Sequence, residues 1–234
     1  MAEVTKYQHI FFDLDHTLWD FHTNSNLALA ELFVKYELAE RLGTTIEVFR
    51  ETYIRINDEM WDKYRNGKVD KKTLRSERFK QALLAFNHDD SSLGVTLDTE
   101  YLEISPRQTA LIPDTIEVLE YLVPKYELHI LTNGFSQVQD IKLTQSGLKP
   151  YFRQVITSES IGVNKPHAPI FQESFRRTGA SCDNSVMIGD NLEADIIGAR
   201  NCGMDQVYFN PEGTLHEEDV TFEIRQLKEL LTFL

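Results

Sequence analysis

The sequence has few cysteines, a deficit of basic residues and no long apolar run. Its two cysteines, Cys182 and Cys202, lack the CxxC or Cys/His spacing of a metal site, so we expect reduced, inert thiols. Lysine and arginine number 24 against 37 acidic residues, and the net charge of −13 argues against binding a nucleic acid polymer or an anionic membrane. A small anionic substrate is not excluded, because a metal and one or two cations can reverse the local field.

The N-terminal stretch MAEVTKYQHIFFDLD lacks the parts of a secretory leader, which are a basic region, a long apolar core and a small-residue cleavage site. No segment approaches the apolar length that a membrane-spanning helix needs. No internal repeat or low-complexity tract is visible either. We therefore expect a cytoplasmic protein that forms one large domain, or a main domain with an insertion.

A buried strand is predicted by the apolar residues Ile10, Phe11 and Phe12, and such an unbroken run fits a parallel strand covered on both faces. From about residue 108, strand and helix patterns alternate, with strands expected in YELHILTNG, FRQVITSE, NSVMIGD and MDQVYFN. The final segment TFEIRQLKELLTFL is expected to add a strand and then a helix. Repeated strand–helix units predict an α/β protein with a Rossmann-like, doubly wound parallel sheet.

A long block of helical pattern interrupts this scheme directly after the first strand. Apolar residues recur close to helical spacing, which predicts helices over 24–41, 44–67 and 71–86. The block therefore predicts an insertion into the α/β fold. We expect a catalytic core of residues 1–17 plus 108–234, with an α-helical cap domain at 18–107.

Polar side chains follow several of the predicted strands, and ligands in open α/β sheets bind beyond the carboxyl ends of the strands. Paired acids end the first strand, a hydroxyl ends the next, a lysine lies in a later loop, and further acids follow the strand NSVMI. These residues are Asp13, Asp15, Thr132, Asn133, Gly134, Lys165, Gly189, Asp190 and Asp195. Together they predict a chemical site rather than a solvent-exposed turn.

This set of residues suits phosphoryl transfer. Asp13 can act as a nucleophile and form an aspartyl-phosphate. Asp13 and Asp190 are placed to hold Mg²⁺, which removes the repulsion between carboxylates and phosphate oxygens. Asp15 lies one strand repeat beyond Asp13 and points the same way if the strand continues. From there it can protonate the leaving oxygen and then deprotonate the attacking water.

The remaining polar residues can bind the phosphoryl group itself. Thr132 and the backbone N–H groups of Asn133 and Gly134 are candidates to hold its oxygens. Lys165 can neutralise charge on the nucleophile and on the transition state. The site is therefore expected to contain a nucleophile, an acid/base, a metal and a phosphate cradle.

For three positions the sequence leaves other roles or residues open. Lys142 is the alternative to Lys165 as the lysine that neutralises charge on the nucleophile. Asp195 either stabilises a helix N-terminus or pairs with Lys165 or the metal. Asn191 is expected to be a helix N-cap.

Four motifs occur in a characteristic order: DxDxT at Asp13–Thr17, a hydrophobic run ending in Thr132, Lys165 in NKP, and GDxxxxD at Gly189–Asp195. This order resembles the haloacid dehalogenase superfamily of phosphohydrolases, across essentially the whole chain. The helical insertion straight after the first motif resembles the subfamily with an α-helical cap.

The resemblance implies specific roles for the acidic residues. Asp13 would be the nucleophile and Asp15 the acid/base. Mg²⁺ would be bound by Asp13, by Asp190 and by the backbone carbonyl of Asp15. His16 occupies a variable position of the motif, and we assign it no catalytic role.

Two longer stretches, FFDLDHTLWDFHTNSNLAL and LTNGFSQVQDIKLTQSGL, resemble the bacterial nucleotidases that act on pyrimidine nucleoside 5′-monophosphates. Their aromatic residues are candidates for the substrate pocket. Trp19 and Phe21 either pack at a hinge or, one of them together with Phe135, flank a base by stacking.

The leading hypothesis is therefore a Mg²⁺-dependent phosphomonoesterase that is a nucleotidase, with a small phosphorylated substrate as its partner. A phosphatase or phosphomutase of small sugar or acid phosphates is the alternative, because the cap architecture is shared. A dehalogenase is disfavoured, since that chemistry needs neither Mg²⁺ nor the acid at Asp15. A phosphorylated signalling receiver would lack both the cap and Asp15, and a catalytically silent binding protein need not keep all four motifs.

Overall fold

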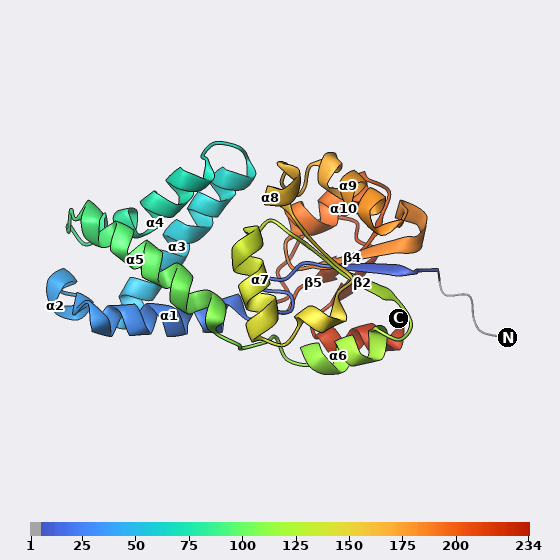
Figure 1. Ribbon diagram of the computed structural model, residues 1–234, viewed down its shortest axis with the longest axis horizontal. Helices are drawn as coiled ribbons and strands as arrows, with labels where there is room; N and C mark the ends of the chain where they lie inside the picture. The colour runs from blue at the N-terminus through green and yellow to red at the C-terminus, as the bar shows by residue number, and fades with distance from the viewer. Residues whose placement is uncertain (1–5) are drawn as a thin grey trace. The chain divides into compact units, whose positions relative to one another are not determined.

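The computed structural model describes residues 6–234 (Figure 1). It contains two compact units: the chain up to Phe21 together with Thr109–Leu234, and His22–Gln108. The cap predicted from the sequence, residues 18–107, differs from the second unit by a few residues at its start and by one at its end. The first five residues of the predicted core segment 1–17, which are also part of the stretch searched for a leader, lie outside the described residues.

The first unit is built on a six-stranded sheet whose neighbouring strands are all parallel. Its spatial order is β3-β2-β1-β4-β5-β6, so the first strand of the chain lies in the middle. The strands are β1 His9–Phe12, β2 Glu127–Thr132, β3 Gln154–Thr157, β4 Ser185–Gly189, β5 Asp205–Phe209 and β6 Phe222–Ile224. The predicted Rossmann-like parallel sheet with a helical insertion is confirmed.

Helices cover both faces of this sheet, as Figure 1 shows for α9 and α10 on one face and α6 on the other. The longer helices are α6 Thr115–Leu122, α7 Ser136–Gln145 and α9 Ala168–Thr178. Shorter ones are α8 Ser158–Ile161, α10 Gly198–Asn201, η2 Lys149–Tyr151, η3 Cys182–Asn184, the π-helix η4 Leu192–Ile197 and the 3-10 helix η5 Leu227–Thr232. This arrangement buries every residue of β1.

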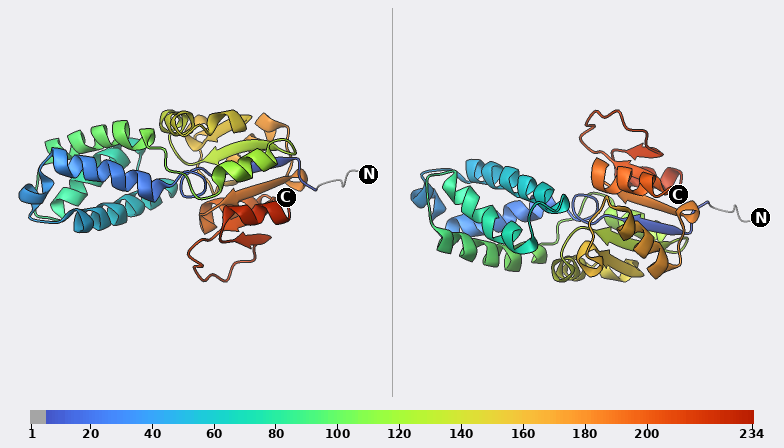
Figure 2. Two further views of the ribbon diagram at one scale, coloured as in Figure 1. Left: turned by 90° about the horizontal axis from the view of Figure 1, so that it is seen from below. Right: turned by 90° about the horizontal axis from the view of Figure 1, so that it is seen from above.

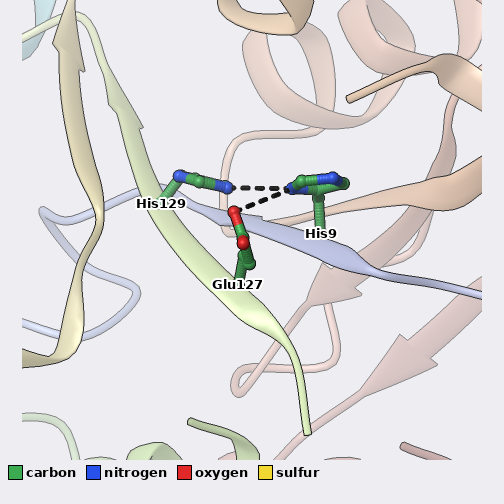
Figure 3. Close-up of side chains that lie close together, drawn as sticks. All are labelled: His9, Glu127 and His129. Atoms are coloured by element: carbon green, nitrogen blue, oxygen red, sulfur yellow. Dashed lines mark hydrogen bonds and ion pairs between the residues drawn. The ribbon is translucent and has the colours of Figure 1, made fainter. Parts of the chain in front are cut away.

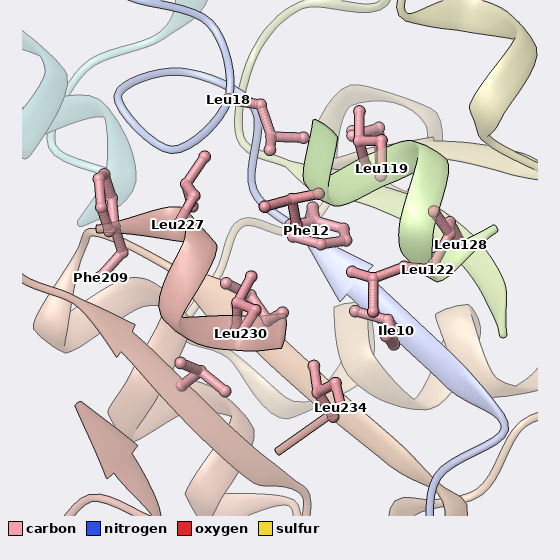
Figure 4. Close-up of a cluster of buried hydrophobic side chains, with 14 of the residues drawn as sticks. Ile10, Phe12, Leu18, Leu119, Leu122, Leu128, Phe209, Leu227, Leu230 and Leu234 are labelled. Atoms are coloured by element: carbon pink, nitrogen blue, oxygen red, sulfur yellow. The ribbon is translucent and has the colours of Figure 1, made fainter. Parts of the chain in front are cut away.

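Alternate residues of β1 belong to two different hydrophobic cores. Ile10 and Phe12 pack with residues of α6 and η5, the cluster drawn in Figure 4. Phe11 points to the opposite face and joins a second cluster with Phe171 of α9 and Ala199 of α10. Because both faces of this strand are covered, apolar side chains are favoured on both, which explains the unbroken run from Ile10 to Phe12.

Several predicted elements differ in detail from the structure. The helix expected over 24–41 is broken into α1 Phe21–Lys35 and α2 Leu38–Leu42, because Glu37 adopts a left-handed backbone conformation between them. The final segment forms the expected strand β6, but the helix after it is a 3-10 helix.

The second unit is a bundle of helices, which Figure 2 shows side by side (blue to green). Besides α2 and most of α1, it contains α3 Ile46–Arg65, α4 Lys71–Leu84, α5 Ser91–Ile104 and the 3-10 helix η1 Ser105–Arg107. α3 and α4 correspond to two of the predicted helices, whereas α5 was not predicted as a separate helix. Across residues 6–234, no helix has the length and apolar character required to cross a membrane.

A buried polar network joins three helices inside this bundle. Arg78 of α4 donates from Nη2 to Asp98 Oδ1 of α5 at 2.6 Å and from Nη1 to Asn57 Oδ1 of α3 at 3.1 Å. The side chains of Arg78 and Asp98 are only 5% and 6% exposed. Removing one partner of such a pair leaves the other charge buried and uncompensated, which is far more costly than losing a surface ion pair.

We therefore expect Asp98→Asn to destabilise the helical unit by about 3 kcal/mol, because the Arg78 guanidinium stays buried without its counter-charge. Glu59→Gln is the matched control, since Glu59 pairs with Arg55 on the exposed side of α3. That change should cost less than about 0.5 kcal/mol. Urea unfolding, monitored by amide hydrogen exchange in the helical unit, measures the change in unfolding free energy for both variants. Equal losses in the two variants would contradict the importance of the buried network.

Candidate active site

The Lys165 ammonium joins several segments at the carboxyl end of the sheet. Its Nζ donates to Asp13 Oδ1 and to Asp195 Oδ1, each at 2.6 Å, and to the carbonyl oxygen of Leu131, also at 2.6 Å. Asp13 directly follows β1, Leu131 belongs to β2, and Asp195 lies in the π-helix after β4. The Lys165 side chain is 2% exposed, so carboxylates rather than water neutralise its charge.

Asn133 holds the loop that carries Lys165. The Asn133 amide donates from Nδ2 to the Lys165 carbonyl oxygen at 3.0 Å, and the Lys165 backbone N–H donates to Asn133 Oδ1 at 2.8 Å. This reciprocal pair ties the end of β2 to the loop after α8. The sequence suggested a backbone role for Asn133 at the phosphate. This clamp by its side chain was not predicted.

Negative charge is in excess around Lys165. Burial raises the pKa of Asp13 well above its usual value, and the carboxylates of Asp195 and Asp190 raise it further against the opposing Lys165 ammonium. Burial also raises the pKa of Asp190 to about 6. Although burial alone would lower it, Asp13 and Asp195 hold the pKa of Lys165 above its usual value. A further positive charge would therefore stabilise the ionised carboxylates.

The acidic side chains offer oxygen ligands for a hard divalent cation. One carboxylate oxygen from each of Asp13, Asp190 and Asp195 lies within 4.8 Å of the others. Asp195 already accepts from Lys165 through Oδ1 and from the Asn191 backbone N–H through Oδ2, at 3.0 Å. Thr17 donates to Asp190 Oδ1 at 2.9 Å, which orients that carboxylate. The donor set fits Mg²⁺, with Asp13 and Asp190 as the carboxylates best placed to bind it and Asp195 behind them.

Asp195 and its surroundings explain the glycine of the last motif. The Asp195 side chain is buried against Lys165, and it also accepts the N–H of Asn191 at the start of the helix. A Cβ at Gly189 would overlap the Asp195 carboxylate, so only glycine lets the strand pass this close. Asn191 is the predicted N-cap, because its side chain accepts from the Ala194 backbone N–H at 2.8 Å.

Asp15 is held by two residues of α7. Gln139 donates from Nε2 to Asp15 Oδ2 at 2.8 Å, and the Lys142 ammonium forms an ion pair with Asp15 Oδ1. Burial alone would raise the pKa of Asp15, but Lys142 and Gln139 together bring it below its usual value. Lys142, the fallback for Lys165, thus contacts Asp15, whereas Lys165 contacts Asp13.

The sequence reasoning missed the contact of Gln139 and Lys142 with Asp15. Both residues lie on the helix expected after Thr132, three positions apart and therefore on the same face. That spacing is the only signal in the sequence for a polar pair directed at the strand ends. It is a weak signal, because a glutamine and a lysine on a helix usually face solvent.

Thr132 and Gly134 form a compact turn next to Gln139. The Gly134 backbone N–H donates to Thr132 Oγ1 at 3.0 Å, and Gln139 Nε2 approaches the same oxygen at 3.4 Å. A Cβ on Gly134 would overlap the Gln139 side chain, so this position also requires glycine. In this structure the Gly134 N–H is engaged by Thr132.

The three aromatic candidates differ in their accessibility. Trp19 is fully buried in the core, and its ring lies 4.2 Å from the Lys142 ammonium. Phe135 is also buried, with 6% of its surface exposed. Phe21 is partly exposed and packs edge-on against Trp19. As the first unit stands, Trp19 therefore presents no ring face to a substrate, and Phe21 is the most accessible of the three.

Comparison with known proteins identifies the family. A family model described as haloacid dehalogenase-like hydrolase matches residues 7–203. Pyrimidine 5′-nucleotidase PynA of Streptococcus pneumoniae is 31% identical over 229 residues, which cover 96% of this chain and 94% of that protein. A glyceraldehyde 3-phosphate phosphatase of Methanothermobacter thermautotrophicus is 33% identical over 235 residues, covering 95% of this chain and 98% of that protein.

Among solved structures, the HAD-hydrolase YfnB from Bacillus subtilis bound to magnesium has a TM-score of 0.89 and 30% sequence identity to this chain. The match covers 97% of this chain and 98% of that one. The family model and these relatives, which match almost the whole chain, agree on one family. The chain belongs to the haloacid dehalogenase-like (HAD) hydrolases.

Proposed function

We propose that this HAD-family phosphatase is a Mg²⁺-dependent pyrimidine nucleoside 5′-monophosphate nucleotidase that works through an aspartyl-phosphate at Asp13. The observation that carries the proposal is the contact between Asp13 and the buried Lys165 ammonium, next to the Asp190 carboxylate. An anionic nucleophile must be approached by an anionic phosphate, and this cluster is where a cation and an ammonium can offset the repulsion.

In the first step an Asp13 carboxylate oxygen attacks phosphorus, the new O–P bond forms, and the bond from phosphorus to the nucleoside oxygen breaks. Asp15 gives its proton to the departing oxygen. Lys165 stays against Asp13 and keeps its carboxylate oriented. When bound at Asp13 and Asp190, Mg²⁺ supplies positive charge to the phosphoryl oxygens.

In the second step Asp15 takes a proton from water, whose oxygen attacks phosphorus and releases Asp13 and inorganic phosphate. Lys142 and Gln139 favour the carboxylate form of Asp15, which is the form needed for this step. The first step needs the protonated form. An entering phosphate raises the pKa of a neighbouring carboxyl group by its negative charge, and so promotes that form.

Similarity supports the substrate class. The pyrimidine nucleotidase from Streptococcus is related over almost the whole chain, and the stretches around Trp19 and Phe135 resemble that branch. Phe21 is the partly exposed aromatic residue that we assign to the base. The magnesium-bound relative from Bacillus supports the metal. The two cysteines are free thiols, which fits the cytoplasmic location that we propose for the enzyme.

A phosphatase of small sugar phosphates is the second candidate. It is favoured by the similarity to a glyceraldehyde 3-phosphate phosphatase, which is as close in identity as the nucleotidase. Both candidates share the chemistry at Asp13, and they differ only in the group that is attached to the phosphate.

The nucleophile is tested by Asp13→Asn. We expect phosphate release to fall by at least about 10³-fold, because an amide oxygen cannot form the phosphoenzyme. Asp140→Asn is the matched control: this acid lies on the exposed side of α7, paired with Lys149, and its loss should leave activity unchanged. Steady-state release of inorganic phosphate with Mg²⁺ measures both. Activity within tenfold of wild type in folded Asp13→Asn would exclude this nucleophile.

The hydrogen bond from Gln139 to Asp15 is tested by Gly134→Ala. The added methyl group displaces the Gln139 amide from Asp15, so we expect kcat to fall about 10- to 100-fold with a smaller change in KM. Gln139→Ala removes the same amide directly and should lose a similar factor. Gln137→Ala, at an exposed position on the same helix, is the control and should behave like wild type. Full activity of Gln139→Ala would show that this contact does not serve turnover.

The substrate is tested with a panel of uridine, deoxyuridine, thymidine and purine monophosphates beside several sugar phosphates. We expect the highest kcat/KM for the pyrimidine nucleotides, with all activity abolished by EDTA and restored by Mg²⁺. A higher kcat/KM for a sugar phosphate would favour the second candidate and leave the proposed chemistry intact. Turnover that survives EDTA would contradict the metal assignment.

A further inference from the structure

Two histidines and a glutamate lie together at the amino end of the sheet, away from the strand ends that carry the candidate active site. His9 is the first residue of β1, and Glu127 and His129 are the first and third residues of β2. His9 pairs in register with Glu127. Because side chains two positions apart in a strand share a face, Glu127 and His129 both lie on the face of His9, as Figure 3 shows.

The three side chains point their polar atoms at one another. His9 Nδ1 lies 3.2 Å from His129 Nε2 and 3.8 Å from Glu127 Oε2. One ligand atom from each residue lies within 4.8 Å of the others. His129 is fully buried and His9 is 8% exposed, whereas the Glu127 side chain is 41% exposed and gives the cluster an opening to solvent.

These residue types are unusual on inner strands of a parallel sheet, where apolar side chains normally fill both faces. Packing alone does not explain His129: its ring contacts Phe11, but its buried Nδ1 has no hydrogen-bond partner. The polar contact of its ring is therefore the one with His9. Burial lowers the pKa of both His129 and His9.

We propose that His9, His129 and Glu127 bind a divalent transition-metal ion of the zinc type, with water as the fourth ligand. Tetrahedral zinc with ligands at about 2.0–2.1 Å places neighbouring ligand atoms about 3.3 Å apart. The separations of 3.2 and 3.8 Å in the cluster are close to this value. The third pair, Glu127 and His129, lies within 4.8 Å, and the half-exposed Glu127 side chain is the ligand that would have to move closer.

The surroundings leave the ligand atoms available. Arg153 donates from Nη2 to Glu127 Oε1 at 3.0 Å, which leaves Oε2 directed at His9. Glu127 and Arg153 also line a surface hollow of about 550 Å³, so the Glu127 end of the cluster lies at the protein surface. The bond of Arg153 to Oε1 orients the Glu127 carboxylate in the way that outer partners of metal ligands do.

This ion would differ from the one at the active site in both chemistry and role. Imidazole nitrogens favour zinc-type ions, whereas Mg²⁺ prefers the carboxylates around Asp13. The four residue steps from His9 to Asp13 span about 13 Å of strand. At that distance the ion does not touch the phosphoryl group. Its effect is to link the first two strands of the core and stabilise the folded state by mass action.

The test uses protein without a polyhistidine tag and Co²⁺ as the probe, because four-coordinate Co²⁺ absorbs visible light strongly. With excess Mg²⁺ present, we expect one equivalent of Co²⁺ to bind with this absorption and to be displaced by Zn²⁺. Zn²⁺ at about a hundredfold above its Kd should raise Tm by about 5 °C. Asp190→Asn should bind Co²⁺ like wild type, since it alters only the carboxylate cluster.

Variants of the cluster assign the ligands. His9→Gln should weaken Co²⁺ binding at least about 100-fold, and Glu127→Gln about tenfold. Glu127 is half-exposed, so its variant keeps the test valid if His9→Gln does not fold. His167→Gln, which changes an exposed histidine outside the cluster, should bind like wild type. The proposal is overturned if wild type binds no stoichiometric Co²⁺, if Glu127→Gln binds with unchanged affinity, or if Asp190→Asn abolishes the signal.

Discussion

The placement of one buried ammonium determines the geometry of the whole candidate site. Lys165 contacts Asp13 after β1, the Leu131 carbonyl in β2 and Asp195 after β4, and so ties together the ends of the three central strands. A charge that is 2% exposed is stable only when its partners are fixed around it. This requirement explains the Asn133 clamp on the Lys165 backbone and the glycine at 189, which leaves room for Asp195.

The same charges explain why we expect a metal ion to bind at the site. Asp13, Asp190 and Asp195 bring more negative charge than Lys165 can balance. Burial, and after it this excess of negative charge, raises the pKa of Asp13 and of Asp190. A divalent cation at Asp13 and Asp190 would keep both ionised. The charge of Asp15 is balanced separately. Lys142 forms an ion pair with the Asp15 carboxylate, and Gln139 donates a hydrogen bond that orients it. The site therefore contains two electrostatic groups, one around the proposed nucleophile and one around the proposed acid/base.

Much of the fold could be predicted because its signals are local. The apolar run before Asp13 and the alternation after residue 108 indicated the parallel sheet, and strand ends in such a sheet converge on one edge. The break between α1 and α2 could not be predicted, because it depends on the left-handed backbone at Glu37. Helix α5 was missed because Gly94 and the β-branched residues Val95 and Thr96 lower its helix propensity.

At the site, the motif residues could be placed on elements but their contacts could not. That Lys165 rather than Lys142 reaches Asp13 depends on how the loop after α8 packs, and that packing involves the Asn133 side chain from a distant part of the chain. Trp19 was a candidate for base stacking, yet its burial against Lys142 follows from tertiary packing that sequence spacing does not encode. The histidines at the other end of the sheet carried no motif, because their proximity arises from the register of β1 against β2.

The most direct test of the account is to trap the phosphoenzyme. Enzyme mixed with Mg²⁺ and a substrate nucleotide is quenched during turnover and treated with borohydride, which reduces an acyl phosphate to an alcohol. Peptide mass spectrometry then locates the modified residue. The account predicts homoserine at position 13, absent when the substrate or Mg²⁺ is omitted. Rapid turnover with no reduction at Asp13, or reduction at another aspartate, would contradict the central role of the carboxylate held by Lys165.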